Sequence, residues 1–272
     1  MDGASHSYTM RTTAVIDHIT HWLRDYCISN RQRGFVVGVS GGIDSAVTSA
    51  LCARTGLPTL CVEMPIHQAP SHVTRALEHV ARLQEEQPNV ALERVDLTPT
   101  FDTLEQALPD SPHDDTRQLA LANTRARLRM TTLYYLAGVH GYLVTGTGNK
   151  IEDFGVGFFT KYGDGGVDLS PIADLTKSEV YALARELGIV QSILDAAPTD
   201  GLFGDSRTDE DQIGASYPEL EWAMDLRDKG GGTEGLSERQ RTVLAIFDKR
   251  RAANRHKMAQ PPVCLIPRDL KS

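Results

Sequence analysis

An apolar run, a glycine turn and a helical segment follow one another directly in this chain, and this order constrains the fold more than any other feature. Residues 35–39 predict a buried parallel strand, and residues 43–55 predict a helix. The Ser40-Gly41-Gly42 turn between them carries little side-chain bulk, so main-chain N–H groups and the positive helix end face the same point. The segment therefore predicts a phosphate-binding loop in an α/β protein.

Asp44 lies within this loop, where a carboxylate repels a phosphate unless a cation separates the two. It therefore predicts a bound Mg²⁺. The loop lacks the Gly-Lys-Ser/Thr ending of a Walker A motif, and its glycines do not follow the G-x-G-x-x-G spacing of dinucleotide-binding folds. An ordinary strand-to-helix turn is the plainer interpretation, but the full Ser-Gly-Gly-x-Asp-Ser pattern favours phosphate binding.

The bulk composition is that of a globular protein, with 40% hydrophobic and 24% charged residues in a chain of 272. A formal net charge of −8 argues against general binding of nucleic acid or anionic membranes. No apolar run is long enough to span a bilayer, and the polar first ten residues lack a signal-peptide core. The four cysteines form neither a C-x-x-C pair nor a zinc pattern, so we expect buried thiols and a cytoplasmic protein.

Strand-like and helical patterns alternate along the chain. Strands are expected at residues 35–39, 59–64, 90–97 and 142–145, and helices at residues 12–26, 43–55, 71–86, 116–137, 176–187 and 236–254. This alternation predicts a doubly wound, mostly parallel sheet flanked by helices, with ligands beyond the carboxyl ends of the strands. We expect residues 1–272 to form one domain. Residues 200–212 are expected to be an acidic loop, and the polar residues 201–222 a mobile flap that orders when nucleotide binds.

Two further glycine-rich segments follow the fourth expected strand. The first, Gly146-Thr147-Gly148-Asn149-Lys150-Ile151-Glu152, begins at the same sheet edge as the phosphate loop. Glu152 is a candidate to share a metal with Asp44, because hard cations take oxygen ligands from separate segments. A glycine turn with a solvated glutamate explains this segment equally well. The second segment is Gly157-Phe158-Phe159-Thr160-Lys161-Tyr162-Gly163-Asp164-Gly165-Gly166-Val167-Asp168.

The phosphate loop resembles that of the ATP pyrophosphatase superfamily, whose members cleave ATP between the α and β phosphates and adenylate a substrate. The second glycine-rich segment resembles the signature of ammonia-dependent NAD synthetases, and Leu175-Thr176-Lys177 follows in the same order. The resemblance extends from about residue 26 to residue 262. It implies an adenine nucleotide alpha hydrolase-like fold. It also implies amidation of deamido-NAD by ammonia through an adenylate, with release of AMP and pyrophosphate.

The resemblance further implies roles for individual residues. The residues matched to ATP contacts are Gly38, Val39, Ser40, Gly41, Gly42, Ile43, Asp44, Ser45, Thr147, Lys177 and Thr199. Asp44 and Lys177 are the implied catalytic residues, and Asp44 and Glu152 the implied Mg²⁺ ligands. The residues matched to deamido-NAD contacts are Arg127, Lys161, Asp168, His256 and Lys257. The basic residues of this set have a plainer interpretation. They could be solvated side chains on helices, or cations that interact favourably with a helix C-terminus.

The chain departs from some family members between Glu152 and Phe158, where it is one residue longer, so Glu152 is a weaker match than Asp44. Glutamine-dependent relatives carry an additional amidase domain. We expect no such glutaminase domain here, and ammonia as the nitrogen donor. The family forms homodimers, and residues 119–137 are a candidate contact surface, although core burial explains their apolar stripe equally well.

Two other functions stay open from the sequence. The first is another AMP-forming ligase with a pyrophosphate loop, which would differ only in the acceptor substrate. Examples are the ligases of GMP synthesis, tRNA thiolation and argininosuccinate formation. The acidic net charge and the lack of paired cysteines disfavour tRNA thiolation. A non-catalytic sensor would bind ATP without releasing pyrophosphate. The phosphate loop, metal carboxylate and additional cations together favour chemistry over sensing.

Overall fold

The computed structural model describes residues 10–110, 114–199 and 208–271, and the sheet in this part of the chain contains four strands. They are β1 (Phe35–Gly38), β2 (Thr59–Glu63), β3 (Val90–Arg94) and β4 (Leu143–Val144). All pairings are parallel, and the strands lie in the order β3-β2-β1-β4. After β3 the chain returns to the other side of β1, so the strand order reverses between β1 and β4. In folds of this type, ligands bind beside such a reversal.

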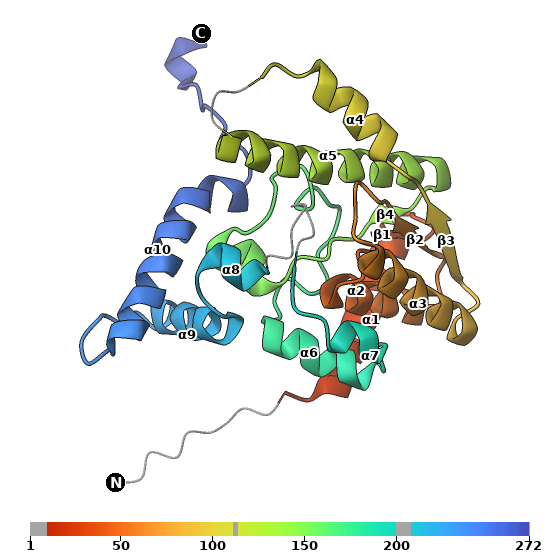
Figure 1. The fold of residues 1–272 in the computed structure, drawn as a ribbon, viewed down its shortest axis with the longest axis horizontal. Helices are drawn as coiled ribbons and strands as arrows, with labels where there is room; N and C mark the ends of the chain where they lie inside the picture. Colours follow the sequence, from red (N-terminus) through yellow and green to blue (C-terminus); the bar gives the residue numbers. More distant parts are fainter. Residues whose placement is uncertain (1–9, 111–113, 200–207, 272) are drawn as a thin grey trace.

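Successive side chains of β1 face opposite sides of the sheet, as the pleat of a strand requires. Phe35 and Val37 join one apolar cluster, and Val36 joins another. The helices on the first side are α1 (Thr12–Ser29), α2 (Ile43–Arg54), α3 (Pro70–Glu86) and α6 (Lys177–Glu186). The helices on the second side are α4 (Thr98–Ala107) and α5 (Asp114–His140), which Figure 1 shows above the sheet. The doubly wound parallel sheet predicted from the sequence is therefore confirmed.

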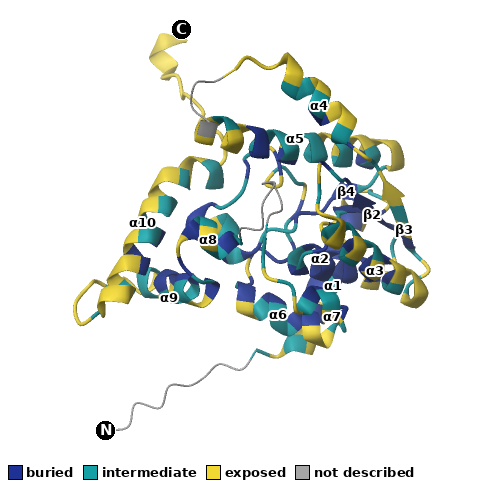
Figure 2. Ribbon diagram, viewed as in Figure 1, coloured by how far each residue is buried: buried dark blue, intermediate teal, exposed yellow. Residues whose placement is uncertain are grey.

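A third apolar cluster lies beside the sheet, on the side away from β3 (Figure 1). Its elements are the π-helix η1 (Ile151–Val156), α9 (Tyr217–Asp228) and α10 (Glu238–Met258). Their buried faces meet at Phe247 and Leu220, while the outward side of α10 is exposed (Figure 2). The remaining short elements are α7 (Gln191–Leu194), α8 (Asp209–Ile213) and the 3₁₀ turn η2 (Arg268–Leu270).

Two expectations about secondary structure were wrong. The third strand ends at Arg94, and α4 follows with a proline in its first turn, a position where the missing N–H of proline costs nothing. Residues 208–222, expected to be loop and flap, instead contribute α8 and the first half of α9, while the expected ordering on nucleotide binding stays a prediction. Tyr217 and Leu220 of α9 are buried at helical spacing. The remaining flap residues, 201–207, lie outside the described part of the chain.

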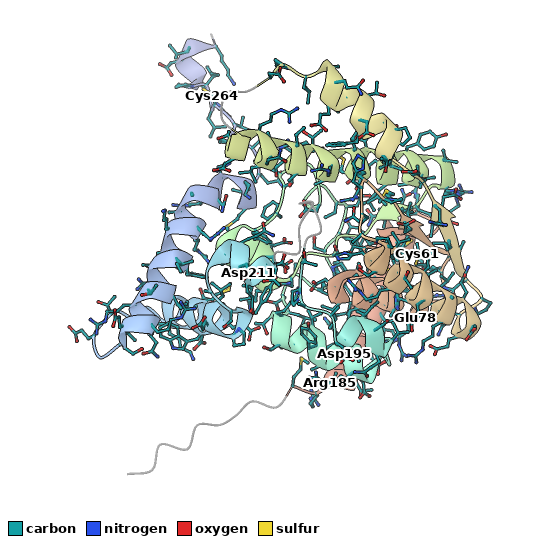
Figure 3. The ribbon with its side chains drawn as sticks, in the orientation of Figure 1. Cys61, Glu78, Arg185, Asp195, Asp211 and Cys264 are labelled. Carbon is teal, nitrogen blue, oxygen red and sulfur yellow. The ribbon has the colours of Figure 1, made fainter. Side chains whose placement is uncertain are left out.

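Several smaller expectations can be compared with the structure. Cys27, Cys52 and Cys61 are buried as predicted, but Cys264 is exposed on the C-terminal segment, far from Cys61 in Figure 3. Trp22 is 40% exposed and packs against the Tyr26 ring. Across the described residues, no helix is both long enough and apolar enough to cross a membrane.

A buried histidine joins α3 to the helix that follows the phosphate loop. His79 is 2% exposed and shares a 2.9 Å hydrogen bond with the Ser49 hydroxyl of α2. Ser49 donates in turn to the main-chain carbonyl of Ser45 at 2.8 Å. Burial, assisted by the charge of Arg82, lowers the pKa of His79 to about 4.

This histidine predicts a loss of stability in mild acid. The unfolded chain protonates His79 near pH 6.5, whereas the folded chain keeps it neutral down to about pH 4. Its contribution is therefore complete above pH 6.5 and lost as the pH falls toward 4. Between pH 7 and pH 4, we expect the unfolding free energy to fall by about 3 kcal/mol more in the wild type than in His79→Gln. Urea denaturation across this range measures the difference, and equal pH dependence in the two proteins would contradict the assignment.

Candidate active site

The loop after β1 is held in its curve by its own two serines. The main-chain N–H of Ser40 donates to Ser45 Oγ at 3.2 Å, and Ser45 Oγ donates to the carbonyl of Gly42 at 3.0 Å. Among the described residues, no side chain caps the N-terminus of α2, which begins at Ile43. The first N–H groups of this helix therefore remain available to an anion, as the sequence predicts.

Gly41 is required at its position for two reasons. Its φ of +78° lies in the left-handed region, and a Cβ there would approach the carbonyl oxygen of His72 to 2.4 Å. The start of α3 thus packs in close contact with the loop. Arg75 of the same helix donates from Nε to the carbonyl of Gly41 at 3.2 Å. Its guanidinium adds positive charge beside the place where phosphates are expected.

The two carboxylates predicted to share a metal converge on one lysine. Lys177 Nζ lies 2.5 Å from Asp44 Oδ2 and 3.1 Å from Glu152 Oε1. Lys177 is 3% exposed. Burial alone would lower the pKa of Lys177, but the neighbouring carboxylates outweigh this and raise its pKa, so the ammonium stays charged. The sequence alone did not predict this contact of Lys177 with both acids.

Local sequence explains how Lys177 comes to this point. Thr176 forms a capping box with Glu179 and so starts α6 directly before the lysine. The main-chain N–H of Lys150 donates to the carbonyl of Leu175 at 2.8 Å, which ties this helix start to the loop after β4. Three segments distant in sequence therefore meet at one buried charge cluster.

Residues that sequence reasoning missed complete the cluster. Tyr217 of α9 donates its hydroxyl to Glu152 Oε1 at 2.5 Å and lies 3.2 Å from Asp209 Oδ2. Asn149 Nδ2 donates to Asp44 Oδ1 at 3.2 Å. No local pattern marks Tyr217 as functional, because its contact depends on how α9 packs. Asn149 stands directly before a helical turn, and that position could have been recognised as a cap.

A cavity of about 250 Å³ opens beside the phosphate loop and the charge cluster. Every residue matched to ATP lines it: Gly38, Val39, Ser40, Gly41, Gly42, Ile43, Asp44, Ser45, Thr147, Lys177 and Thr199. Glu152 lines it as well. The structure thus brings the whole predicted set together around one space, while the contacts with ATP themselves stay a prediction.

Four more carboxylates line this cavity, those of Glu63, Asp153, Asp164 and Asp209, and burial raises the pKa of two of them. Burial, with the charge of Glu152 acting in the same direction, raises the pKa of Asp153 to about 8. Burial likewise raises the pKa of Asp164 to about 6, against a hydrogen bond from the Thr160 main chain. Both carboxyl groups therefore have a pKa above that of a free aspartate, because burial disfavours their charged form.

The residues matched to deamido-NAD lie elsewhere. Among the described residues that line the cavity, none belongs to this set. Lys161 Nζ donates to the carbonyl of His256 at 2.8 Å, near the end of α10, and Arg127 donates to the carbonyl of Lys161 at 3.3 Å. Lys257 Nζ donates to the carbonyls of Gly157 and Phe159, each at 2.5 Å. Main-chain carbonyls accept the hydrogen bonds of these cations, and the carboxylates of Asp164 and Asp153 also act on the charge of Lys257.

Asp168 is separate from that basic group. Its carboxylate accepts from the Val144 main-chain N–H at 2.8 Å and from the Tyr134 hydroxyl at 3.0 Å. Both oxygens thus have donors that fix the end of β4. The structure gives Asp168 a structural role, and its predicted contact with deamido-NAD stays untested.

The acidic cluster fits a hard divalent cation. Asp44 and Glu152 already converge on a single positive charge, that of Lys177, next to the phosphate loop. No group of three or more His, Cys, Asp or Glu side chains suited to a metal occurs among the residues described. Two carboxylates are nevertheless sufficient for Mg²⁺, which completes its shell with waters and substrate phosphates.

The parallel sheet, the anion-binding loop and the paired carboxylates define an α/β nucleotide-binding protein. Residues 15–261 match the family model described as NAD synthase. The chain is 34% identical over 265 residues to the NH(3)-dependent NAD(+) synthetase of Syntrophomonas wolfei, covering 97% of this chain and 100% of that protein. It is 40% identical over 207 residues to the enzyme of the same name from Carboxydothermus hydrogenoformans, covering 75% and 82%. The chain belongs to the NAD synthase family.

Solved structures agree with this placement. An NMN synthetase from Francisella tularensis superposes with a TM-score of 0.80 at 31% identity, covering 95% of this chain and 99% of that one. An NH3-dependent NAD synthetase from Campylobacter jejuni superposes with a TM-score of 0.75 at 24% identity, covering 94% and 100%. The second comparison shows a shared fold.

The shared ammonium predicts a large stability effect. In metal-free buffer at pH 7, Lys177→Met leaves Asp44 and Glu152 facing each other without their cation, and we expect a loss of about 3 kcal/mol of unfolding free energy. Lys150→Met is the matched control, because its partner Asp174 has a side chain 98% exposed. That pair is worth less than about 1 kcal/mol. Urea denaturation compares the two variants, and equal losses would show that the buried cluster is not held by charge.

Proposed function

We propose that the chain catalyses the ATP-dependent amidation of deamido-NAD to NAD with ammonia, releasing AMP and pyrophosphate. The observation that carries this proposal is the position of Lys177, Asp44 and Glu152 beside a phosphate loop. The relatives that match over most of the chain are named NH(3)-dependent NAD(+) synthetases, which supports ammonia as the nitrogen donor. A single synthetase domain and a cytoplasmic location stay predictions.

The residues around the cavity have different roles in the first step, the formation of the adenylate. The loop N–H groups and Arg75 bind the ATP phosphates, and Lys177 stabilises the charge that develops during the reaction. A carboxylate oxygen of the nicotinate attacks the α-phosphorus, forming a P–O bond while the bond to the bridging oxygen of pyrophosphate breaks. Asp44 and Glu152 would hold Mg²⁺, which when bound neutralises phosphate charge.

The second step requires no protein nucleophile. Ammonia forms a C–N bond to the carbonyl carbon of the acyl adenylate, AMP leaves with the electrons of the broken C–O bond, and the nitrogen loses a proton. Exclusion of water from the cavity during this step would protect the adenylate from hydrolysis.

The basic group formed by α5, the turn at Lys161 and α10 supports recognition of an anionic acceptor. Arg127 and Lys161 lie outside the ATP cavity, and their charge suits the phosphates of a dinucleotide. His256 and Lys257 belong to the same group at the end of α10. We infer that the acceptor binds against this group and extends its nicotinate toward the cavity.

The experiment supplies ATP, Mg²⁺ and ammonium with deamido-NAD, and measures NAD and pyrophosphate. We expect stoichiometric formation of both, and a rate at least about 100-fold lower for Asp44→Asn, because a charged partner of the reacting phosphates is lost. ATP binding without pyrophosphate release would identify a sensor instead.

A second acceptor deserves a parallel assay. The NMN synthetase from Francisella tularensis superposes with a TM-score of 0.80 and is 31% identical to this chain. This similarity favours nicotinate mononucleotide as an alternative acceptor, which has the same carboxylate and lacks the second nucleotide. The ratio of kcat/KM for the two acceptors decides between them. A ratio favouring the mononucleotide would change the assigned substrate while leaving the chemistry intact.

We also propose that the chain functions as a homodimer through α5. Tyr135 is 69% exposed and Val139 is 57% exposed on this helix, four residues apart on one face. Arg127, a candidate acceptor contact, lies on the same helix and is also exposed. Pairing of this face would bury the apolar side chains beside the acceptor site.

Light scattering coupled to gel filtration tests this proposal. The wild type is expected to have twice the mass of the 29.8 kDa chain. Tyr135→Arg is expected to shift the protein toward monomer, because it places a charge in an apolar contact. Tyr26→Arg, at an exposed aromatic residue of α1, is the control and is expected to leave the mass unchanged. A monomeric wild type at micromolar concentration would rule the dimer out.

A further inference from the structure

Asn149 is a fully buried polar residue between β4 and η1, with 0% exposure. Its amide nitrogen donates to Asp44 Oδ1 at 3.2 Å. Its amide oxygen accepts from the main-chain N–H groups of Ile151 and Glu152, each at 3.1 Å. One side chain thus contacts both segments that carry the candidate metal carboxylates.

We propose that Asn149 is a positioning residue that fixes Asp44 and Glu152 relative to each other, so that both can hold one Mg²⁺ with the ATP phosphates. The proposal rests on the function proposed above and assigns to Asn149 a role in metal affinity. Asn149 itself has no negative charge and its amide is used by protein groups, so it acts through the two acids rather than as a ligand.

The contact with Asp44 sets the rotation of that carboxylate. Asp44 Oδ2 is taken by Lys177 and Oδ1 by Asn149, so each oxygen has its own donor. The lysine has a long, flexible stem and must adjust when a nucleotide and its metal arrive. The asparagine is short, and its oxygen is anchored to two main-chain N–H groups. The orientation of Asp44 therefore depends on Asn149 whenever Lys177 moves.

The contact with η1 sets the position of Glu152. This six-residue turn is π-helical, a conformation that is rare and occurs mostly as single turns. Asn149 accepts from its first main-chain N–H groups, which otherwise have no partner within the turn. The Asn149 main-chain carbonyl also accepts from Asp153 at 2.9 Å. Loss of the cap would let the first turn shift, and Glu152 would shift with it.

A purely structural cap is the competing explanation, and two substitutions separate it from positioning. Asn149→Ser keeps an oxygen of a type favoured at helix N-termini, but its side chain is too short to reach Asp44 and adds no charge. Asn149→Ala removes both contacts. If Asn149 only caps the turn, the serine variant will behave as wild type. If it positions Asp44, both variants will lose metal-dependent binding, and the alanine variant, which also loses the cap before Glu152, will lose at least as much as the serine variant.

The probe is α,β-methylene ATP, a non-cleavable analogue, titrated calorimetrically with Mg²⁺ and again with excess chelator. For the wild type, we expect tighter binding with Mg²⁺. In Asn149→Ser, we expect the Mg²⁺-dependent gain in affinity to fall by about 10- to 100-fold, as is usual when a partner of a metal-binding residue is lost. Affinity measured in chelator should be unchanged, and the Tm should lie closer to wild type than that of Asn149→Ala.

Ser237→Ala is the matched control, because Ser237 caps α10 through the Gln240 N–H, away from the cavity lining. It should lower the Tm and leave the Mg²⁺ dependence unchanged. A serine variant with the wild-type Mg²⁺ dependence would overturn the positioning role while leaving the proposed function standing. A wild type whose nucleotide binding ignores Mg²⁺ would overturn both.

Discussion

The structure depends on one buried ammonium. Lys177 lies between Asp44 and Glu152 with almost no exposure to solvent, and a charge so placed is stable only because opposite charges meet it. The three residues come from the helix after β1, the turn after β4 and the start of α6. If one segment is misplaced, a charged side chain on another is left buried without one of its partners. The folding of this region and the assembly of the site therefore depend on each other.

The sheet makes that meeting possible. Because β1 and β4 are parallel neighbours, the segments that follow them leave the sheet at the same edge, where the order of the strands reverses. Asp44 and Asn149, distant in sequence, are thereby within hydrogen-bond distance. The third apolar cluster adds a support from outside the sheet, because Tyr217 reaches Glu152 from α9. Polar contacts at the candidate site thus connect the cluster that contains α2 and α6 with the third apolar cluster.

Much of this could be predicted from the sequence where the signal is local. Apolar runs gave the strands, and the Ser-Gly-Gly-x-Asp-Ser pattern gave the loop, since both depend on neighbouring residues. The helix α4 was missed because its apolar stripe is short, with Phe101 as its one buried residue. Residues 208–222 were misread because their polarity hides Tyr217 and Leu220, whose burial depends on α10 and η1.

The sequence by itself determined the phosphate loop, the parallel α/β sheet and the identity of the acids and lysine, because each follows from short-range pattern and residue chemistry. Only the tertiary structure decided that Lys177 bridges both acids, that Asn149 and Tyr217 hold them, and that Arg127 and Lys161 do not line the cavity beside the phosphate loop. These contacts join residues far apart in the chain, and their geometry is set by how helices pack on the sheet.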